Sequence, residues 1–203
     1  MPKNTADTRK PESFKRLKNS ELREREHLLP DEVERLIQAA KSVGRHGLRD
    51  SLLILVGYHH GLRVSELTDL RWSDLDFKSA HLYVRRLKGS NPSTHPIDGR
   101  ELRGLRSLQR NQGKEPSPWV FVSERKSPLT PDAVRKVIRR SGEVAELPFP
   151  VHPHQLRHAC GYYLAAKGYD LRLIQSWLGH RSLTNTLVYT RLAPGHLDTV
   201  RWD

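Results

Sequence analysis

Apolar and polar residues between Leu28 and Gly44 alternate with the period of an α-helix. Pro30 suits the first turn of such a helix, and the acidic residues after it favour a helix start. Four apolar residues then recur at positions i, i+3, i+4 and i+7: Val33, Leu36, Ile37 and Ala40. The next segment, about 47–59, is apolar nearly all round. We therefore expect an amphipathic helix followed by a more central one.

The period then shortens to that of a β-strand. Residues 80–84, Ala-His-Leu-Tyr-Val, are typical of a strand, and residues 94–97 of a second one. The polar segment 88–92 between them contains Gly and Pro and favours a turn. These patterns predict a β-hairpin with Lys88 in its turn. Residues 119–122 are a short apolar piece, which we expect to be a third strand.

Helical patterns cover most of the rest of the chain. We expect helices over 63–70, 100–109, 131–144, 153–167, 170–178 and 183–191. The predicted fold class is therefore α+β, mostly α-helical, with a small antiparallel β-sheet. Residues 1–26 mix basic and acidic side chains with little apolar material, which favours a flexible basic tail. Residues 27–203 are expected to form one domain, with no separate N-terminal domain before it.

Charge narrows the range of partners. The 203 residues include 35 Lys and Arg against 23 Asp and Glu, a formal net charge of +12. An excess of this size favours a polyanionic partner, most often a nucleic acid. A solubilising surface is the alternative. An anionic membrane is a weaker one, because the sequence shows no strongly amphipathic basic helix with aromatic anchors.

Other classes of protein are excluded by composition. No apolar run approaches the ~20 residues of a membrane-spanning helix, and the first residues lack the apolar segment of a secretory signal. A single cysteine, Cys160, excludes a disulfide framework and a multi-cysteine metal site. We expect a cytoplasmic protein.

Three polar segments are candidates for chemistry, and a tyrosine, Tyr189, follows the last of them. They are Gly61-Leu62-Arg63-Val64-Ser65-Glu66-Leu67, His152-Pro153-His154-Gln155-Leu156-Arg157-His158 and Leu178-Gly179-His180-Arg181-Ser182-Leu183. Taken singly, each has a structural explanation: Arg63 could pair with Glu66, and Tyr189 could be a core residue.

Their combination resembles the tyrosine recombinase (phage-integrase) family. The shared order is Arg63-x-x-Glu66, Lys88 in a hairpin, His154-x-x-Arg157, Leu178-Gly179-His180, and Tyr189 nine residues later. The resemblance runs from about Leu28 to Arg191. The chain is most similar to the small recombinases that invert fimbrial promoter elements, in fragments such as Arg86-Leu87-Lys88-Gly89, Thr94-His95-Pro96, His152-Pro153-His154 and Tyr189-Thr190.

The resemblance implies DNA cleavage by Tyr189 through a transient 3′-phosphotyrosyl bond. A tyrosine hydroxyl with an ordinary pKa of ~10 is a poor nucleophile at neutral pH, so nearby positive charge must favour its ionised form. Attack on a phosphodiester builds negative charge on two oxygens. Arg63 and Arg157 are implied as the clamp for those oxygens, a task that suits the guanidinium fork.

The remaining roles also follow from the resemblance. His154 and His180 would hydrogen-bond the phosphate or accept the tyrosine proton. Lys88 would protonate the departing 5′-oxygen. Glu66 would orient Arg63 without touching DNA. Because the covalent link conserves the bond energy, the reaction would need no ATP, metal ion or other cofactor.

The implied partners are double-stranded DNA with short inverted-repeat sites and further copies of the chain, as a tetramer in the synaptic complex. Accessory DNA-bending proteins and nucleoid association are also implied. Larger members of the family carry a separate N-terminal domain that closes around DNA. Only about 26 tail residues precede the catalytic part here. Either this tail supplies a minimal grip on DNA, or a partner protein supplies it, or the protein alone binds DNA weakly.

Several other interpretations are possible. A non-catalytic DNA-binding regulator could use the same fold, and a type IB topoisomerase shares the chemistry without synapsis. His154 and His158 have the i, i+4 spacing of metal ligands, but no glutamate follows His154 as a zinc-protease helix would need. Asp74 and Asp76 could bind magnesium, yet they fit turn and cap positions better.

Overall fold

The computed structural model describes residues 27–86, 90–113 and 116–189. The helices and strands, in chain order, are α1 (Pro30–Ser42), α2 (Gly47–His59), α3 (Val64–Thr68), the short 3-10 helix η1 (Trp72–Asp74), β1 (Leu75–Asp76), β2 (His81–Val84), β3 (Ser93–Pro96), α4 (Gly99–Asn111), α5 (Pro131–Val144), α6 (Pro153–Ala166), α7 (Leu171–Leu178) and α8 (Thr184–Leu187). The predicted class, mostly helical with a small antiparallel sheet, is confirmed. The predicted N-terminal tail lies outside the described residues.

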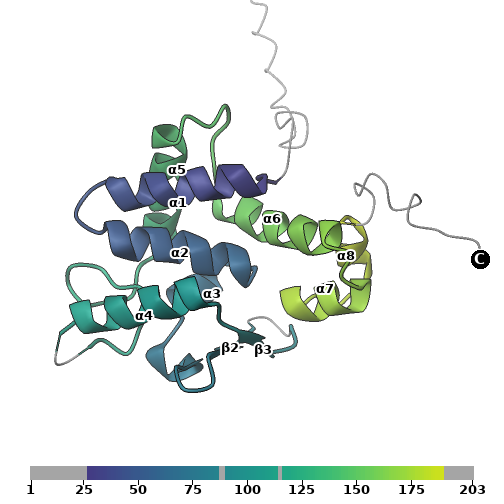
Figure 1. The fold of residues 1–203 in the computed structure, drawn as a ribbon, viewed down its shortest axis with the longest axis horizontal. Coiled ribbons are helices and arrows are strands. Elements are labelled where there is room, and N and C mark those ends of the chain that lie inside the picture. Colours follow the sequence, from purple (N-terminus) through teal and green to yellow (C-terminus); the bar gives the residue numbers. More distant parts are fainter. Residues whose placement is uncertain (1–26, 87–89, 114–115, 190–203) are drawn as a thin grey trace, which may run out of the picture.

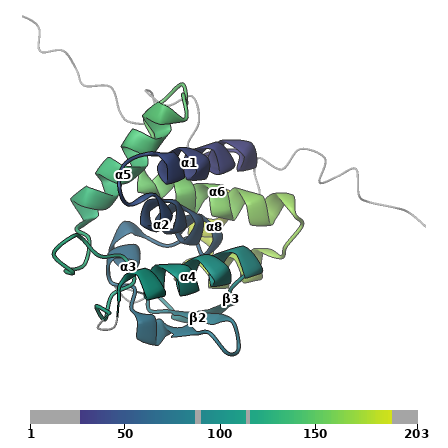
Figure 2. The same ribbon diagram turned by 60° about the vertical axis from the view of Figure 1, so that its left-hand side comes forward.

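Helix α2 is the centre of the fold. Figures 1 and 2 show it between α1 and α4, with α6 alongside. Its Leu53 and Ile54 are fully buried, as a helix that is apolar all round requires. Helix α4 approaches closely at Gly104, where an added Cβ would lie 2.4 Å from the Leu52 side chain. The prediction of a central helix over 47–59 is confirmed.

The sheet has the strand order β1-β2-β3, and both pairings are antiparallel. Leu82 pairs with Leu75 on one side and His95 on the other. Alternation along β2 buries Leu82 and Val84 and exposes His81 and Tyr83. The predicted hairpin is confirmed by the β2–β3 pairing. Its turn residues 87–89, which include Lys88, lie outside the described part.

The prediction of a strand at residues 119–122 is wrong. This segment makes only isolated bridges, Arg71 with Trp119 and Val122 with Pro128. Its backbone bonds to irregular segments on both sides, with Val120 N–H donating to Leu70 and Phe121 C=O accepting from Leu129. Val120 and Phe121 are both buried, so the segment is enclosed on two sides instead of alternating. The third strand of the sheet is β1.

The C-terminal helices pack at one end of α6 (Figure 1). Helix α7 ends at Leu178 and is followed by Gly179, whose left-handed φ of 66° suits glycine. The helix predicted over 183–191 is shorter than expected, because α8 ends at Leu187 and Tyr189 lies in the turn after it. Residues 190 and 191 lie outside the described residues. None of the helices in the described ranges has the length and apolar character needed to cross a membrane.

Candidate active site

Arg63 is held at the start of α3 by Glu66. Its backbone N–H donates to Glu66 Oε2 at 2.8 Å, and its Nη1 donates to Glu66 Oε1 at 2.8 Å. The Arg63 side chain is 37% exposed and that of Glu66 is 2% exposed. A buried carboxylate therefore holds a partly exposed guanidinium. The contact expected between these two residues is present.

Arg157 extends from α6 into the interior and is 3% exposed. Its Nη1 donates to the Gly61 carbonyl at 2.5 Å and its Nη2 donates to the Leu178 carbonyl at 2.6 Å. Burial lowers the pKa of this arginine to about 10, and the charges of Arg63 and Arg86 add to the effect. One side chain thus joins the segment before α3 to the last residue of α7.

Arg86 is a member of this cluster that the sequence analysis did not assign. It follows β2 and is fully buried at its side chain, with Nη1 donating to Glu66 Oε2 at 2.8 Å and Nη2 donating to the Trp177 carbonyl. Although burial raises it, the charge of Arg86 and the hydrogen bonds from Arg63 hold the pKa of Glu66 below its usual value. The signal that could have found Arg86 is strand alternation, which places it on the same side as the buried Val84.

His180 follows the glycine that ends α7. Its Nδ1 lies 3.0 Å from Thr186 Oγ1, and its backbone carbonyl accepts from Gln175 Nε2 at 3.1 Å. Its ring stacks on that of Tyr189 with centroids 6.3 Å apart and an interplanar angle of 9°. Burial, with the charges of Arg157 and Arg63, lowers the pKa of His180 to about 4. The imidazole is therefore neutral at pH 7.

Tyr189 is 2% exposed and lies against α6. Its ring fills the space over Gly161, where an added Cβ would lie 2.5 Å from the ring. Burial raises the pKa of its hydroxyl to about 12, opposed by the charge of Arg157. The hydroxyl is therefore protonated at neutral pH.

The histidine beside the Tyr189 hydroxyl is His158, to which the sequence analysis assigned no chemistry. Its Nδ1 lies 3.3 Å from the hydroxyl oxygen. His154, the predicted partner, is exposed, and its Nε2 lies 2.8 Å from His158 Nε2. The signal for His158 was the i, i+4 spacing on α6, which places both imidazoles on one face of the helix.

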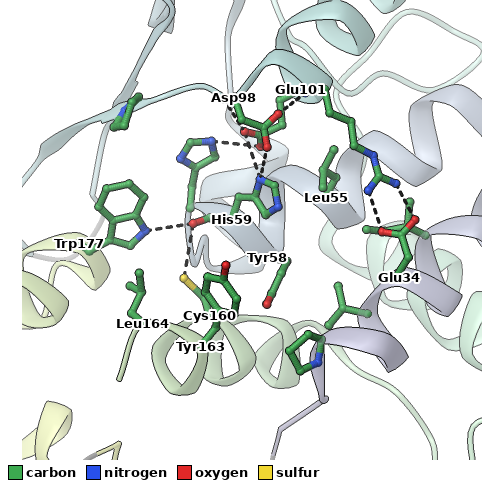
Figure 3. Close-up of a pocket in the computed structure, with 16 residues that line it drawn as sticks. Glu34, Leu55, Tyr58, His59, Asp98, Glu101, Cys160, Tyr163, Leu164 and Trp177 are labelled. Carbon is green, nitrogen blue, oxygen red and sulfur yellow. Dashed lines mark hydrogen bonds and ion pairs between the residues drawn. The ribbon is translucent and has the colours of Figure 1, made fainter. Parts of the chain in front are cut away.

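A cavity of about 350 Å³ opens elsewhere, between α1, α2, α6 and α7 (Figure 3). At its rim His59 Nδ1 lies 3.3 Å from both Asp98 Oδ2 and Glu101 Oε2. Trp177 Nε1 and Cys160 Sγ donate to the His59 carbonyl, as Figure 3 shows. None of the predicted catalytic residues within the described ranges lines this cavity.

His59, Asp98 and Glu101 are the group in the described residues whose ligand atoms lie close enough to hold a metal ion. Although burial lowers it, the hydrogen bond and charge of Glu101 and the charge of Asp98 raise the pKa of His59 above its usual value. Asp98 and Glu101 also cap α4 reciprocally, with Glu101 N–H donating to Asp98 Oδ1 at 2.8 Å. These contacts favour an ion-pair cluster at the start of α4.

Comparison with known proteins identifies the family. Residues 26–196 match the model of the Phage integrase family. The chain is 39% identical over 184 residues to the type 1 fimbriae regulatory protein FimB of Escherichia coli K12, covering 89% of this chain and 91% of FimB. It is 41% identical over 170 residues to FimE of the same strain, covering 82% and 85%.

A solved structure, the crystal structure of XerA recombinase, has a TM-score of 0.76 and 29% sequence identity. The match covers 87% of this chain and 66% of that one, so this chain spans about two thirds of the length of XerA. The fold predicted from the sequence motifs is therefore confirmed. The chain belongs to the phage integrase family and is a tyrosine-type site-specific recombinase.

Proposed function

We propose that this recombinase cleaves DNA through the Tyr189 hydroxyl and forms a transient 3′-phosphotyrosyl bond. The observation that supports this most is the position of Tyr189: its ring stacks on His180, its hydroxyl lies 3.3 Å from His158, and the charge of Arg157 acts on it. A phenol among cations and neutral imidazoles suits attack on a phosphodiester, whose anion the cations attract.

The phosphate would be held by Arg63 and Arg157. Each keeps N–H groups beyond those used on Glu66 or on the Gly61 and Leu178 carbonyls, because a guanidinium has five donors. Fixing part of each fork on the protein leaves the rest pre-oriented for the non-bridging oxygens. Glu66 positions Arg63. His180 would donate to the phosphate, and His154 would take part in proton transfer.

Lys88 is proposed as the acid that protonates the leaving 5′-oxygen. It falls outside the described residues. Its proposed role is supported by its position in the sequence two residues after Arg86, which donates to Glu66 and to the Trp177 carbonyl. An ammonium group can release its proton to a basic oxygen, whereas a guanidinium keeps its own.

The proposed substrate is double-stranded DNA with short inverted repeats, between which the enzyme inverts a DNA element. The net charge of +12 suits this polyanion, and the similarity to FimB and FimE over most of their length favours inversion over integration. We propose residues 27–203 as the catalytic domain, a tetramer in the synaptic complex, and action at the nucleoid with DNA-bending partners. No metal ion, ATP or cofactor enters this mechanism.

The test is a suicide substrate nicked beside the cleavage site. Wild-type protein should be trapped on the 3′ end, and Tyr189→Phe should bind the same DNA without forming the adduct. An adduct on another residue would refute the assignment. Incubation with supercoiled plasmid carrying two inverted sites separates the alternatives: inverted product supports the proposal, relaxed topoisomers alone indicate type IB topoisomerase activity, and binding alone indicates a non-catalytic regulator.

A further inference from the structure

Two imidazoles on α6 connect the Tyr189 hydroxyl with the exterior of the protein. His158 Nδ1 lies 3.3 Å from the hydroxyl oxygen, and His158 Nε2 lies 2.8 Å from His154 Nε2. The ring centroids are 5.8 Å apart between Tyr189 and His158, and 4.3 Å apart between His158 and His154. Exposure increases along the series, because Tyr189 is buried, His158 is half-buried and His154 is exposed.

The two contacts accommodate a series of hydrogen bonds that runs outward from the phenol. In this series the Tyr189 hydroxyl donates to His158 Nδ1, and the single N–H of neutral His158 is on Nε2. That N–H then donates to His154 Nε2, which must be an acceptor at 2.8 Å. Each donor in the series points away from the phenol. The arrangement therefore has the polarity that proton removal from Tyr189 requires.

The surroundings keep His158 neutral in the free protein. Burial lowers its pKa to about 4, and unfavourable charge interactions with His154, Arg157, His27 and His152 add to the effect. The Tyr189 ring, with its centroid 5.8 Å from that of His158, is a further titratable neighbour, and His158 and His180 interact electrostatically. A docked phosphate brings negative charge to the same arginines. It therefore offsets their effect and makes His158 more basic when the substrate is present.

We propose that His158 is the base that accepts the Tyr189 proton and that His154 passes this proton to solvent. As the phenolic oxygen bonds to phosphorus, the phenol proton moves to His158 Nδ1 and the Nε2 proton of His158 moves to His154 Nε2. The resulting His154 imidazolium releases a proton to water, while the bond from phosphorus to the 5′-oxygen breaks. Religation runs the same transfers in reverse. This inference rests on Tyr189 being the nucleophile.

The test compares His158→Asn with His154→Asn in single-turnover cleavage of the suicide substrate from pH 6 to pH 10. Asparagine retains an acceptor near the Nδ1 position but cannot take a proton. We expect His158→Asn to be slower by about 10²-fold at pH 7, within the range of general-base catalysis. The deficit should shrink about tenfold per pH unit, because hydroxide replaces the missing base. His154→Asn should lose less than about tenfold, since water can occupy its exposed position.

Two further measurements distinguish a base from a structural residue. His158→Ala should be accelerated by added imidazole, whereas His81→Asn, an exposed histidine on β2, should cleave like wild type and ignore imidazole. On DNA whose bridging 5′-oxygen is replaced by sulfur, the His158→Asn deficit should remain, because sulfur removes the need for an acid and not for a base.

A His158→Asn variant that cleaves within threefold of wild type at pH 7 would overturn the inference. So would a deficit that is the same at every pH and insensitive to imidazole, which would mark a packing role. Either result leaves the nucleophile intact as long as Tyr189→Phe is inactive. A Tyr189→Phe variant that still cleaves would instead refute the proposed nucleophile, and the relay with it.

Discussion

Two groups of histidines in this protein have opposite electrostatic surroundings. In the candidate active site, burial and arginine charges lower the pKa of His158 and of His180 to about 4. At the cavity, Asp98 and Glu101 raise the pKa of His59 despite its burial. Trp177 lies between the two groups, with its indole N–H bonded to the His59 carbonyl and its own carbonyl bonded to Arg86.

The comparison shows how one side-chain type is set to two tasks by its neighbours. An imidazole among guanidiniums stays neutral and can accept a proton or bind an anion alongside them. An imidazole between carboxylates is an ion-pair partner and contributes to the end of a helix. The active-site group is thus poised for chemistry, whereas the cavity group stabilises the start of α4.

The largest expected effect concerns the cation proposed to complete the active-site group. Lys88→Ala should slow cleavage of ordinary DNA by about 10²–10⁴-fold, the range of general-acid catalysis. On DNA with a 5′-bridging sulfur its rate should approach that of wild type, because that leaving group needs no proton. An equal defect on both substrates would mean that Lys88 only binds phosphate. If Arg86→Ala were the rescued variant, the acid would be misassigned.

The arginines that hold the active-site histidines neutral should come next. Arg63→Ala and Arg157→Ala should each slow cleavage by roughly 10²–10³-fold, by analogy with losing one pre-organised donor at a developing anion. DNA affinity should fall far less, since many phosphate contacts contribute to it. Single-turnover cleavage and binding titrations at fixed salt measure both. Cleavage within threefold of wild type would mean that the arginine is a surface charge.

The two arginine variants should differ in stability, which sharpens the comparison further. Arg157 is buried and holds the Gly61 and Leu178 carbonyls, so its loss leaves two buried acceptors without their donor. Arg63 is partly exposed. Thermal denaturation should therefore show a clear loss of Tm for Arg157→Ala and a small one for Arg63→Ala.

Removing the charge of Glu66, the carboxylate that binds Arg63 and Arg86, should lower stability. Glu66→Gln leaves the buried Arg86 without its compensating charge, and we expect the free energy of unfolding to drop by about 3 kcal/mol. The matched control is Glu34→Gln. Glu34 forms an exposed ion pair with Arg100, and such a pair contributes less than about 1 kcal/mol to stability. Equal losses in urea denaturation of the two variants would contradict the assigned burial of the Glu66 pair.

The smallest expected effect separates the two histidine groups by pH. The pKa of His59 is raised on folding, so its stabilisation is full below an unfolded pKa of about 6.5 and is lost as pH rises through the folded value. The pKa of His158 is lowered, so its neutral form favours the fold above about 6.5, and this is lost as pH falls toward 4.

Replacing His59 and replacing His158 should therefore lower Tm most at opposite ends of the pH range. His59→Gln should reduce Tm more at pH 5.5 than at pH 8.5, whereas His158→Asn should become relatively more favourable as pH falls. After solvent screening each difference should be on the order of 1 kcal/mol, or about 2–4 °C. Differences of the same sign in both variants would contradict the opposite surroundings of the two groups.

Much of the fold could be predicted from the sequence, because local signals mark its boundaries. Helices α2 and α5 begin and end at the predicted residues, where Gly47 and Pro131 start apolar-periodic segments. The missed features depend on which distant segments meet. A two-residue strand, β1, has almost no local signal, and the apolar segment 119–122 is a strand by composition but is enclosed by irregular backbone.

The candidate site shows the same difference between features with a local sequence signal and features that depend on distant contacts. Motif order predicted Arg63, Arg157, His180 and Tyr189 as one site, and the structure brings these residues close together. Strand alternation places Arg86 on the buried side, but the sequence could not say that it meets Glu66, because that depends on which distant segments come together. It also could not say that His158 and not His154 touches Tyr189, because that depends on how α6 faces the C-terminal turn. The ion-pair cluster at the cavity joins α2 to the start of α4 and was missed for the same reason.

The glycine at position 161 has a consequence for a cell whose chromosome offers millions of phosphodiesters. A side chain there would displace the Tyr189 ring, so the missing Cβ allows the hydroxyl proposed as nucleophile to stay covered in the free protein. With Tyr189 as the nucleophile, an unwanted break would require two events at once: a phosphate bound at the arginines, and a rearrangement of the covering segments that admits this phosphate to the hydroxyl while its contact with His158 is kept. The frequency of accidental breaks would be the product of the two probabilities, so weak, nonspecific contact with DNA would be tolerated.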